Sequence, residues 1–306
     1  MKTCTLIINP NSGRRHKRIN LNKVKKIFNK YNYDVNIIFT EYRGHAREIV
    51  KNTTSDIVIS VGGDGTFNEV MTGNFERKER VLVSHIPLGT ANDIGAMYGY
   101  GRFLNRNFEL LLKGTVKGID ICTINGKPFT YVAALGKFTN ISYETPRYLK
   151  KRFGYLAYLI EGLRDLRNPV KKYNLKYTVN GEEQEINSTF MIVSNANRIA
   201  GINNFYHDIK LDDNKFEVLF CEMSDAKEVI KSLYHLKDGD ISTLNGFKFY
   251  KTDKINIKFN KCLEKGWSVD GEELEDKEKE FNVEIVRNVK VLLPNKNIKK
   301  LFINKE

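Results

Sequence analysis

The sequence contains no long hydrophobic run and few cysteines, and each absence narrows the class of protein. No apolar stretch in the 306 residues approaches the ~20 residues that a membrane-spanning helix needs. The first apolar stretch is too short for a signal peptide and is expected to form a strand. The four cysteines form no Cys-x-x-Cys pair and the five histidines show no metal-ligand spacing, so neither disulfides nor a zinc site is expected. We expect a cytoplasmic protein.

Acidic residues are in short supply, with 37 Asp and Glu against 50 Lys and Arg, which gives a formal net charge of +13. Such a balance favours anionic partners such as nucleotides, nucleic acid or anionic membrane surfaces. A composition rich in lysine and asparagine gives the same charge without any such partner. The hydrophobic content of 41% is typical of a globular protein. The length favours two domains, because single cores rarely grow beyond about 250–300 residues.

The first 122 residues alternate apolar runs with segments whose apolar residues recur at helical spacing. Strands are expected at 3–9, 35–39, 57–61 and 81–86, and helices at 21–31, 44–51, 66–72 and around 108–112. This alternation predicts parallel strands with right-handed crossovers, and therefore a Rossmann-like α/β domain.

From residue 123 to residue 289 the pattern becomes β-rich and mostly antiparallel. Hairpins with Asn-Gly turns are expected to join 119–124 to 129–134 and 175–179 to 185–193, and further strands are expected at 216–221, 247–250, 255–259 and 281–286. Helices at 151–167 and 226–236 interrupt this β-sandwich-like domain. The tail at about 290–306 is expected to return to the first domain.

Four loops of small and polar residues follow the strands of the first half. They are Asn9–Gly13, Thr40–Gly44, Gly62–Thr66 and Gly89–Asp93. Because the carboxyl ends of parallel strands lie along one edge of a sheet, the four loops are expected to surround one crevice. Glycines let a ligand approach main-chain N–H groups, and a helix after the third loop points its positive end at the same place. We predict a nucleotide-phosphate site there.

The loop at 62–66 matches neither of two common phosphate-binding motifs. No Gly-Lys-Ser/Thr follows it, so it is not a Walker A loop. Asn68 stands where Gly-x-Gly-x-x-Gly needs its third glycine, which weighs against a simple dinucleotide dehydrogenase. For Asp64 three roles stay open on the residues alone: a general base, a metal contact through water, or a turn-stabilising carboxylate.

Three stretches of the second half each have a functional and a structural interpretation. Asp270-Gly271-Glu272 is either a base in an interdomain cleft or a β-turn. The run from Asp212 to Lys215, with Asp208 nearby, is either a site for a hard cation or a polar turn. The basic segment Arg147–Phe153, with the amphipathic helix after it, either touches an anionic bilayer or packs in the core.

As a set, these motifs resemble the diacylglycerol kinase catalytic-domain family, and within it the soluble bacterial lipid kinases. The motifs are Asn9-Pro10-Asn11-Ser12-Gly13, Gly62-Gly63-Asp64-Gly65-Thr66-x-Asn68-Glu69, Pro87-Leu88-Gly89-Thr90-Ala91-Asn92-Asp93 and Asp270-Gly271-Glu272, and the resemblance covers nearly the whole chain. It implies an α/β ATP-binding domain and a β-sandwich lipid domain. It also implies transfer of the γ-phosphoryl group of ATP to a lipid hydroxyl, with diacylglycerol converted to phosphatidic acid as the leading reaction.

The resemblance further implies roles for single residues. The positions that match ATP contacts are Asn9, Pro10, Asn11, Ser12, Gly13, Thr40, Gly62, Gly63, Asp64, Gly65, Thr66, Asn68, Glu69, Thr90 and Asn92. Asp270 matches the carboxylate that deprotonates the lipid hydroxyl, with Glu272 in the same network. Asp213 matches the side-chain ligand of a structural Mg²⁺, with the main-chain oxygens of Lys210 and Lys215 around it. The proline, alanine and glycine of that metal pattern are replaced here.

The domains expected on this basis are 1–122, with about 290–306, and 123–289. ATP and Mg²⁺ are the expected cofactors, and the partners are a membrane lipid, peripheral contact with an anionic membrane surface, and no nucleic acid; a homodimer stays open. Sphingoid-base and ceramide kinases are alternatives that the motifs barely separate. An NAD kinase shares the Gly-Gly-Asp-Gly loop but is disfavoured by the other motifs. A non-catalytic nucleotide-binding protein has no need of Asp270 and Glu272.

Overall fold

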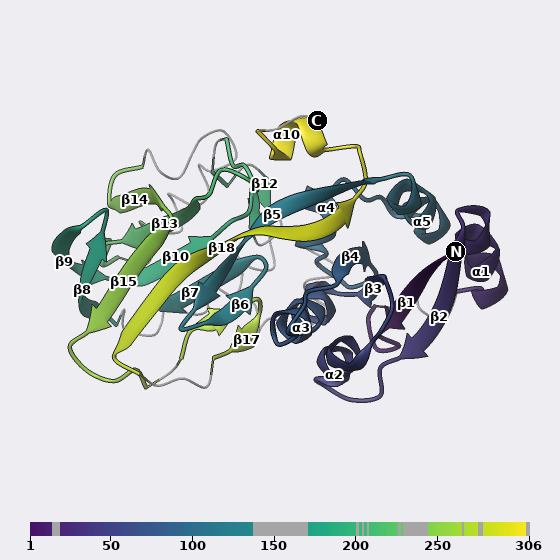
Figure 1. The fold of residues 1–306 in the computed structure, drawn as a ribbon. Coiled ribbons are helices and arrows are strands. Elements are labelled where there is room, and N and C mark those ends of the chain that lie inside the picture. The colour runs from purple at the N-terminus through teal and green to yellow at the C-terminus, as the bar shows by residue number, and fades with distance from the viewer. Residues whose placement is uncertain are drawn as a thin grey trace. The chain divides into compact units, whose positions relative to one another are not determined.

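The computed structural model describes residues 1–13, 19–136, 171–199, 202–203, 205–206, 208–225, 228, 244–264, 266–274 and 278–303. The chain divides into two compact units (Figure 1). Unit 1 comprises Met1–Ile121, Lys210–Asp213 and Arg287–Glu306, and unit 2 comprises Cys122–Ile209 and Asn214–Val286. The basic run at 14–18, the segment at 147–153 and the helices expected at 151–167 and 226–236 lie outside the described residues, apart from Glu228.

Unit 1 is built on a parallel sheet. The strand order is β2 (Tyr33–Phe39), β1 (Lys2–Ile8), β3 (Ile57–Gly62), β4 (Leu82–Pro87), and the end of β18 (Glu280–Leu293) joins β4 in parallel through Val291 and Val83. All six residues of β3 are buried, as expected for a strand covered on both faces. The parallel α/β architecture predicted for this half is therefore confirmed.

Helices connect the strands of unit 1, and a short helix follows the last strand. They are α1 (Leu21–Lys30), α2 (His45–Asn52), α3 (Asp64–Phe75), α4 (Asp93–Met97), α5 (Leu104–Leu112) and α10 (Ile298–Leu301). In α1 the side chain of Asn20 caps the N-terminus, and Val24, Ile27 and Phe28 bury one face. The short helix α4 was not predicted. None of the helices in the described part of the chain is long and apolar enough to cross a membrane.

Unit 2 is a β-sandwich. One sheet contains β9 (Glu182–Ser188), β8 (Tyr173–Val179), β15 (Lys254–Phe259) and β18, with β5 (Thr115–Ile124) between β18 and β6 (Lys127–Phe129). The other has the order β14 (Phe247–Thr252), β13 (Phe216–Cys221), β10 (Phe190–Ser194), β7 (Val132–Gly136), β16 (Ser268–Val269), β17 (Glu272–Glu273), and a small ribbon pairs β11 (Arg198–Ile199) with β12 (Ile202–Asn203). Apolar side chains from both larger sheets, among them Trp267 and Phe281, form one buried cluster.

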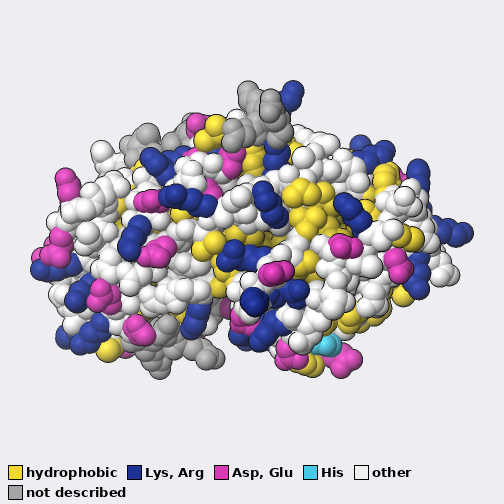
Figure 2. Space-filling view, in the orientation of Figure 1, with side chains coloured by type: hydrophobic (Ala, Val, Ile, Leu, Met, Phe, Trp, Pro, Cys, Tyr) yellow, Lys and Arg dark blue, Asp and Glu magenta, His cyan; other side chains and the backbone are white. Residues whose placement is uncertain are grey.

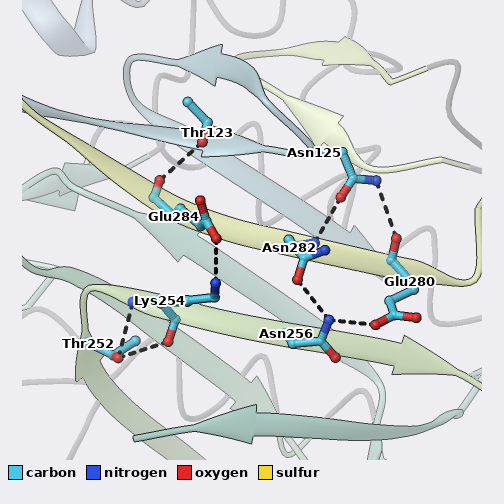
Figure 3. A network of polar contacts seen from close by, with 8 residues as sticks. All are labelled: Thr123, Asn125, Thr252, Lys254, Asn256, Glu280, Asn282 and Glu284. Carbon is cyan, nitrogen blue, oxygen red and sulfur yellow. Dashed lines mark hydrogen bonds and ion pairs between the residues drawn. The ribbon is translucent and has the colours of Figure 1, made fainter.

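Polar side chains align three neighbouring strands of the first of these sheets (Figure 3). Asn256 Nδ2 on β15 donates to Glu280 Oε1 and to Asn282 Oδ1 on β18, each at 2.8 Å. Asn282 in turn donates its N–H to Asn125 Oδ1, just after β5, at 2.8 Å. These contacts are solvent-exposed, so they fix the register of the strands more than they stabilise the fold.

Two predicted strands are wrong in the same way. The strand expected at 129–134 is broken into β6 and β7 at Thr130 and Tyr131, and the strand expected at 185–193 is broken into β9 and β10 at Thr189. At each break the chain leaves one sheet of the sandwich and enters the other. Neither crossing contains a glycine or a proline, so each stretch looked like one strand. The strand expected to end at 286 is also wrong, since β18 continues to Leu293.

Three hairpins of unit 2 turn through an Asx-Gly pair. Asn125-Gly126, Asn180-Gly181 and Asp270-Gly271 all have positive φ at both residues. This backbone is typical of type I′ turns, whose twist matches that of the flanking strands. Asp270 therefore does occupy a β-turn. Whether it can also act as a base depends on the surroundings of its side chain.

Candidate functional site

Hydrogen bonds join the loop after β1 to the loop after β3. The N–H of Asn9 donates to the Val61 carbonyl at 3.0 Å, and Asn9 Nδ2 donates to Thr66 Oγ1 at 3.1 Å. Ser12 Oγ accepts the N–H of Gly63 at 3.2 Å. The first predicted loop therefore lies directly against the glycine loop, as expected from the strand order.

The loop after β3 is joined in turn to the loop after β4. The N–H groups of Leu88 and Gly89 both donate to the Gly62 carbonyl, at 2.6 and 3.1 Å. The carboxylate of Asp64 accepts the N–H of Asp93 at 3.1 Å and of Ile94 at 3.2 Å, and so caps the start of α4. Of the three roles left open for Asp64, the turn-stabilising one is what these contacts show.

The loop after β2 joins the same group through α3. Glu69 Oε2 accepts the N–H of Ala46 in the first turn of α2, at 3.2 Å. Thr40, which is 8% exposed, donates its N–H to the Ile8 carbonyl at 2.9 Å. All four predicted loops are thus brought together at the carboxyl ends of β1 to β4. Residues on α3 hold three of them, because Asp64, Thr66 and Glu69 each bond to a different loop.

Two glycines of these loops are required by close packing. A Cβ on Gly13, where φ is +60°, would overlap the Leu88 carbonyl oxygen, and a Cβ on Gly89 would lie 2.6 Å from Gly63 Cα. Gly44 and Gly65 differ, because a Cβ at either position would meet nothing within 4 Å. Gly65 lies in the first turn of α3, where main-chain N–H groups point along the helix axis toward a ligand. An anion can therefore approach the first turn of α3 at Gly65.

The remaining predicted residues of this site are less tightly held. Asn11 donates its N–H to Asn9 Oδ1 at 2.8 Å, which closes a turn around Pro10. Asn92 Nδ2 donates to the Gly89 carbonyl at 2.8 Å. Thr90 in the same loop is exposed, and Asn68 on α3 is partly buried. Hydroxyls, amides and main-chain donors thus gather at one sheet edge, which suits the binding of a phosphate chain.

The carboxylate of Asp270 belongs to unit 2 and accepts four hydrogen bonds from one segment. Its Oδ2 accepts from the Thr130 N–H at 2.6 Å and from the Thr130 hydroxyl at 2.8 Å, and its Oδ1 accepts from the N–H groups of Tyr131 and Val132 at 2.9 Å each. Asp270 is 7% exposed. Glu272 lies two residues further, on β17, and is partly exposed. No feature of the sequence predicts the donors at 130–132, because they depend on the strand break between β6 and β7.

The loop predicted to hold structural magnesium is hydrogen-bonded to the C-terminal tail. The N–H of Leu211 donates to the Leu301 carbonyl at 2.8 Å, and the N–H of Ile303 donates to Asp212 Oδ1 at 2.8 Å. Lys210 Nζ donates to the Lys300 carbonyl at 3.0 Å. No cluster of three or more His, Cys, Asp or Glu side chains that could hold a metal occurs in the described ranges. These contacts engage the Asp212 carboxylate and the Lys210 ammonium group, whereas the predicted ligands are the Asp213 carboxylate and the main-chain oxygens of Lys210 and Lys215. The magnesium site therefore stays a prediction.

A buried histidine lies beneath the glycine-loop helix. His85 on β4 is fully buried, and its ring lies 5.0 Å from that of Phe67 on α3. Its Nδ1 is 2.8 Å from Ser60 Oγ, whereas its Nε2 has no hydrogen-bond partner. Burial lowers the pKa of His85 to about 3, because a second N–H on the ring would have no acceptor.

This histidine predicts a pH dependence of stability. Since the pKa of His85 is lower in the folded than in the unfolded chain, its contribution is fully present above pH 6.5 and is lost as the pH falls toward 3. Between pH 7 and pH 5 we expect the free energy of unfolding to fall by about 2 kcal/mol from this group. Urea titrations of the wild type and of His85→Gln at both pH values measure it. An equal pH dependence in the two proteins would contradict the assignment.

An α/β unit with a joined set of glycine loops, together with a β-sandwich unit, is the architecture of a two-domain kinase. Comparison with known families gives the particular one. The family model for the diacylglycerol kinase catalytic domain matches residues 3–124, and the model for the YegS C-terminal NAD kinase beta sandwich-like domain matches residues 139–291. The chain therefore belongs to the diacylglycerol kinase catalytic-domain family, and it is a phosphotransferase.

Similar proteins agree with this family over the full length. The chain is 29% identical over 308 residues to the diacylglycerol kinase of Staphylococcus aureus strain MRSA252, with 100% of this chain and 96% of the relative covered. A solved structure of a diacylglycerol kinase from Bacillus anthracis strain Sterne aligns with a TM-score of 0.73 at 22% identity, over 95% of this chain and 97% of that one. Another structure from the same organism gives a TM-score of 0.79 at 23% identity, over 95% of each chain. The predicted family and fold class are confirmed.

Proposed function

We propose that this protein is an ATP-dependent lipid kinase whose acceptor is the free hydroxyl of diacylglycerol, with phosphatidic acid as the product. The observation that carries the proposal is the set of hydrogen bonds that joins four loops at the carboxyl ends of β1 to β4, next to the first turn of α3, in a chain of this family. The name of the Staphylococcus aureus relatives supports the choice of lipid.

In this mechanism residues of the protein bind the phosphates of ATP and accept the proton of the lipid hydroxyl. The first turn of α3 and the hydroxyl and amide groups of the joined loops hold the phosphates of ATP. Asp270 accepts the proton of the lipid hydroxyl while the hydroxyl oxygen bonds to the γ-phosphorus. The bond between the γ-phosphorus and the bridging oxygen breaks, ADP leaves, and Asp270 returns its proton to water. Mg²⁺ bound to the nucleotide supplies neutralisation of the phosphate charge, as phosphoryl transfer requires.

The test is direct. Purified protein is incubated with γ-labelled ATP and, in parallel, with diacylglycerol, a sphingoid base, ceramide and NAD, and the products are separated by thin-layer chromatography. We expect label in phosphatidic acid. Label in a sphingoid or ceramide phosphate would show that the protein is a lipid kinase with a different acceptor. Label in NADP, or in no acceptor at all, would overturn the proposal.

The basic charge predicts peripheral contact with acidic membranes. Lys and Arg side chains are spread over the visible face, with Asp and Glu among them (Figure 2). Each basic residue near an anionic surface contributes about 1 kcal/mol, and the net charge is +13. We expect sedimentation with vesicles that contain phosphatidylglycerol, loss of that binding at high salt, and little binding to phosphatidylcholine alone. Equal binding to both vesicle types at low salt would refute the prediction.

A further inference from the structure

The four donors around Asp270 come from the point where the chain passes from one sheet of unit 2 to the other. Residues 130 and 131 lie between β6 and β7, and β7 begins at Val132. Their N–H groups converge on the two carboxylate oxygens, while Asp270 returns its own N–H to the Val132 carbonyl at 2.8 Å. Both Thr130 and Asp270 are less than a tenth exposed. Donors of the protein, and not solvent, therefore hold the carboxylate in a fixed position.

Donors in this number favour the ionised carboxylate over the protonated acid. The three N–H groups are fixed by the main chain. The Thr130 hydroxyl differs, because it belongs to a side chain and can rotate without any movement of the backbone. Oδ2, which accepts this hydroxyl at 2.8 Å, is therefore the oxygen at which a substrate hydroxyl can take the place of a protein donor.

We propose that Thr130 is a positioning residue, whose hydroxyl orients Oδ2 of Asp270, sets the proton affinity of this carboxylate and gives way to the acceptor hydroxyl of the lipid. The proposal rests on the proposed function, in which Asp270 accepts the proton. No bond other than this hydrogen bond is made or broken by Thr130. Its effect on the reaction is exerted through Asp270 alone.

Other groups that titrate near this hairpin are few in the described ranges. The titratable side chains on the elements around Asp270 are Lys127 on β6, Tyr131 between the strands, and Glu272 and Glu273 on β17, while β7 and β16 carry none. Glu273 Oε1 accepts the N–H of Gly266 at 3.2 Å. All four groups are unchanged when Thr130 is replaced, so a comparison of Thr130 variants isolates the hydroxyl.

The experiment compares Thr130→Val, which keeps the shape of the side chain, with Thr130→Ser, which keeps the hydroxyl. The pH dependence of kcat/KM for the lipid is measured for both and for the wild type. For Thr130→Val we expect the acid limb of the profile to move to higher pH by about one unit, since a hydrogen bond to a charged group is lost. Thr130→Ser is expected to restore the wild-type limb, with the KM for ATP unchanged throughout. A limb that stays in place in an active Thr130→Val enzyme would overturn the proposal.

A second measurement does not depend on turnover. Because the hydroxyl stabilises the ionised carboxylate, the difference in free energy of unfolding between Thr130→Ser and Thr130→Val should be constant from pH 7 to about 5. It should shrink as the pH falls below about 4, where the carboxylate takes up its proton in the folded variants. A difference that is constant with pH would show a packing role alone and would overturn the proposal. If the wild type phosphorylates no lipid, the proposed function fails, while this difference still decides whether Thr130 sets the proton affinity of Asp270.

Discussion

Asp270→Asn is expected to lower kcat by about 10²–10⁴-fold, because an amide cannot accept the proton of the lipid hydroxyl. The same change is expected to lower stability. The carboxylate accepts two hydrogen bonds at each oxygen, whereas an amide offers one oxygen and one NH₂ group. In its better orientation the NH₂ group replaces Oδ2, the Thr130 hydroxyl turns to accept from it, and the buried Thr130 N–H loses its acceptor. That loss costs about 1–3 kcal/mol.

Activity and urea-induced unfolding of the variant measure the two effects separately. Asn180→Asp is the matched control. It replaces an amide by a carboxylate in the Asn180-Gly181 hairpin, where both residues have positive φ as in the Asp270-Gly271 hairpin. Asn180 is exposed. The control is expected to keep activity and stability. Near-wild-type turnover of Asp270→Asn would contradict the assignment of Asp270 as the general base. Unchanged stability would instead contradict the geometry of the four hydrogen bonds.

The elements of unit 1 could be predicted because their signals are local. Strand β3 is a continuous apolar run, and α1 carries its apolar residues at helical spacing behind an Asn cap. Each of these features is complete within about ten residues of sequence. The helix α4 was missed for the opposite reason. It has five residues, and its first two N–H groups are capped by Asp64, about thirty positions away.

The strand breaks in unit 2 could not be predicted from local patterns. At Thr130 the N–H groups turn away from the strand because the carboxylate of Asp270, 140 positions later in the chain, accepts them. At Thr189 the N–H donates to the Cys221 carbonyl at 2.8 Å. Both partners are distant in sequence, so neither composition nor alternation reveals them. A hairpin that changes sheets looks the same in the sequence as one that does not.

The candidate site shows a related limit. Strand order predicted that four loops would meet, and they do. The spacing of the motifs did not separate residues that hold the loops from residues left facing open space. Asp64 and Glu69 cap neighbouring helices, and Asn9 bonds to Thr66. Several motif residues therefore assemble the edge of the site, while at Gly65, as at Gly44 in the second loop, the main chain is open to a ligand.

Gly65→Ala is expected to lower kcat/KM for ATP by about 10²-fold while the fold becomes slightly more stable. A Cβ at this position meets nothing within 4 Å in the protein, and the residue lies inside α3. Replacing glycine by alanine in a helix favours the folded state by about 0.5–1 kcal/mol. A methyl group in the open space would nevertheless displace a phosphate that approaches the first turn of the helix, and misplacement by about 1 Å costs about 10²-fold in rate.

Two other glycines provide the controls for this prediction. Gly101→Ala also places a methyl group in open space in unit 1, outside the four loops, so it should leave both kcat/KM for ATP and the stability unchanged. Gly89→Ala places its Cβ 2.6 Å from Gly63 Cα, so it should lower stability and activity together. Nucleotide titration and urea unfolding of the three variants distinguish these outcomes. If Gly65→Ala binds ATP as the wild type does, the phosphates do not lie at the start of α3. Because weaker ATP binding is expected together with higher stability, a general loss of folding cannot imitate the expected result.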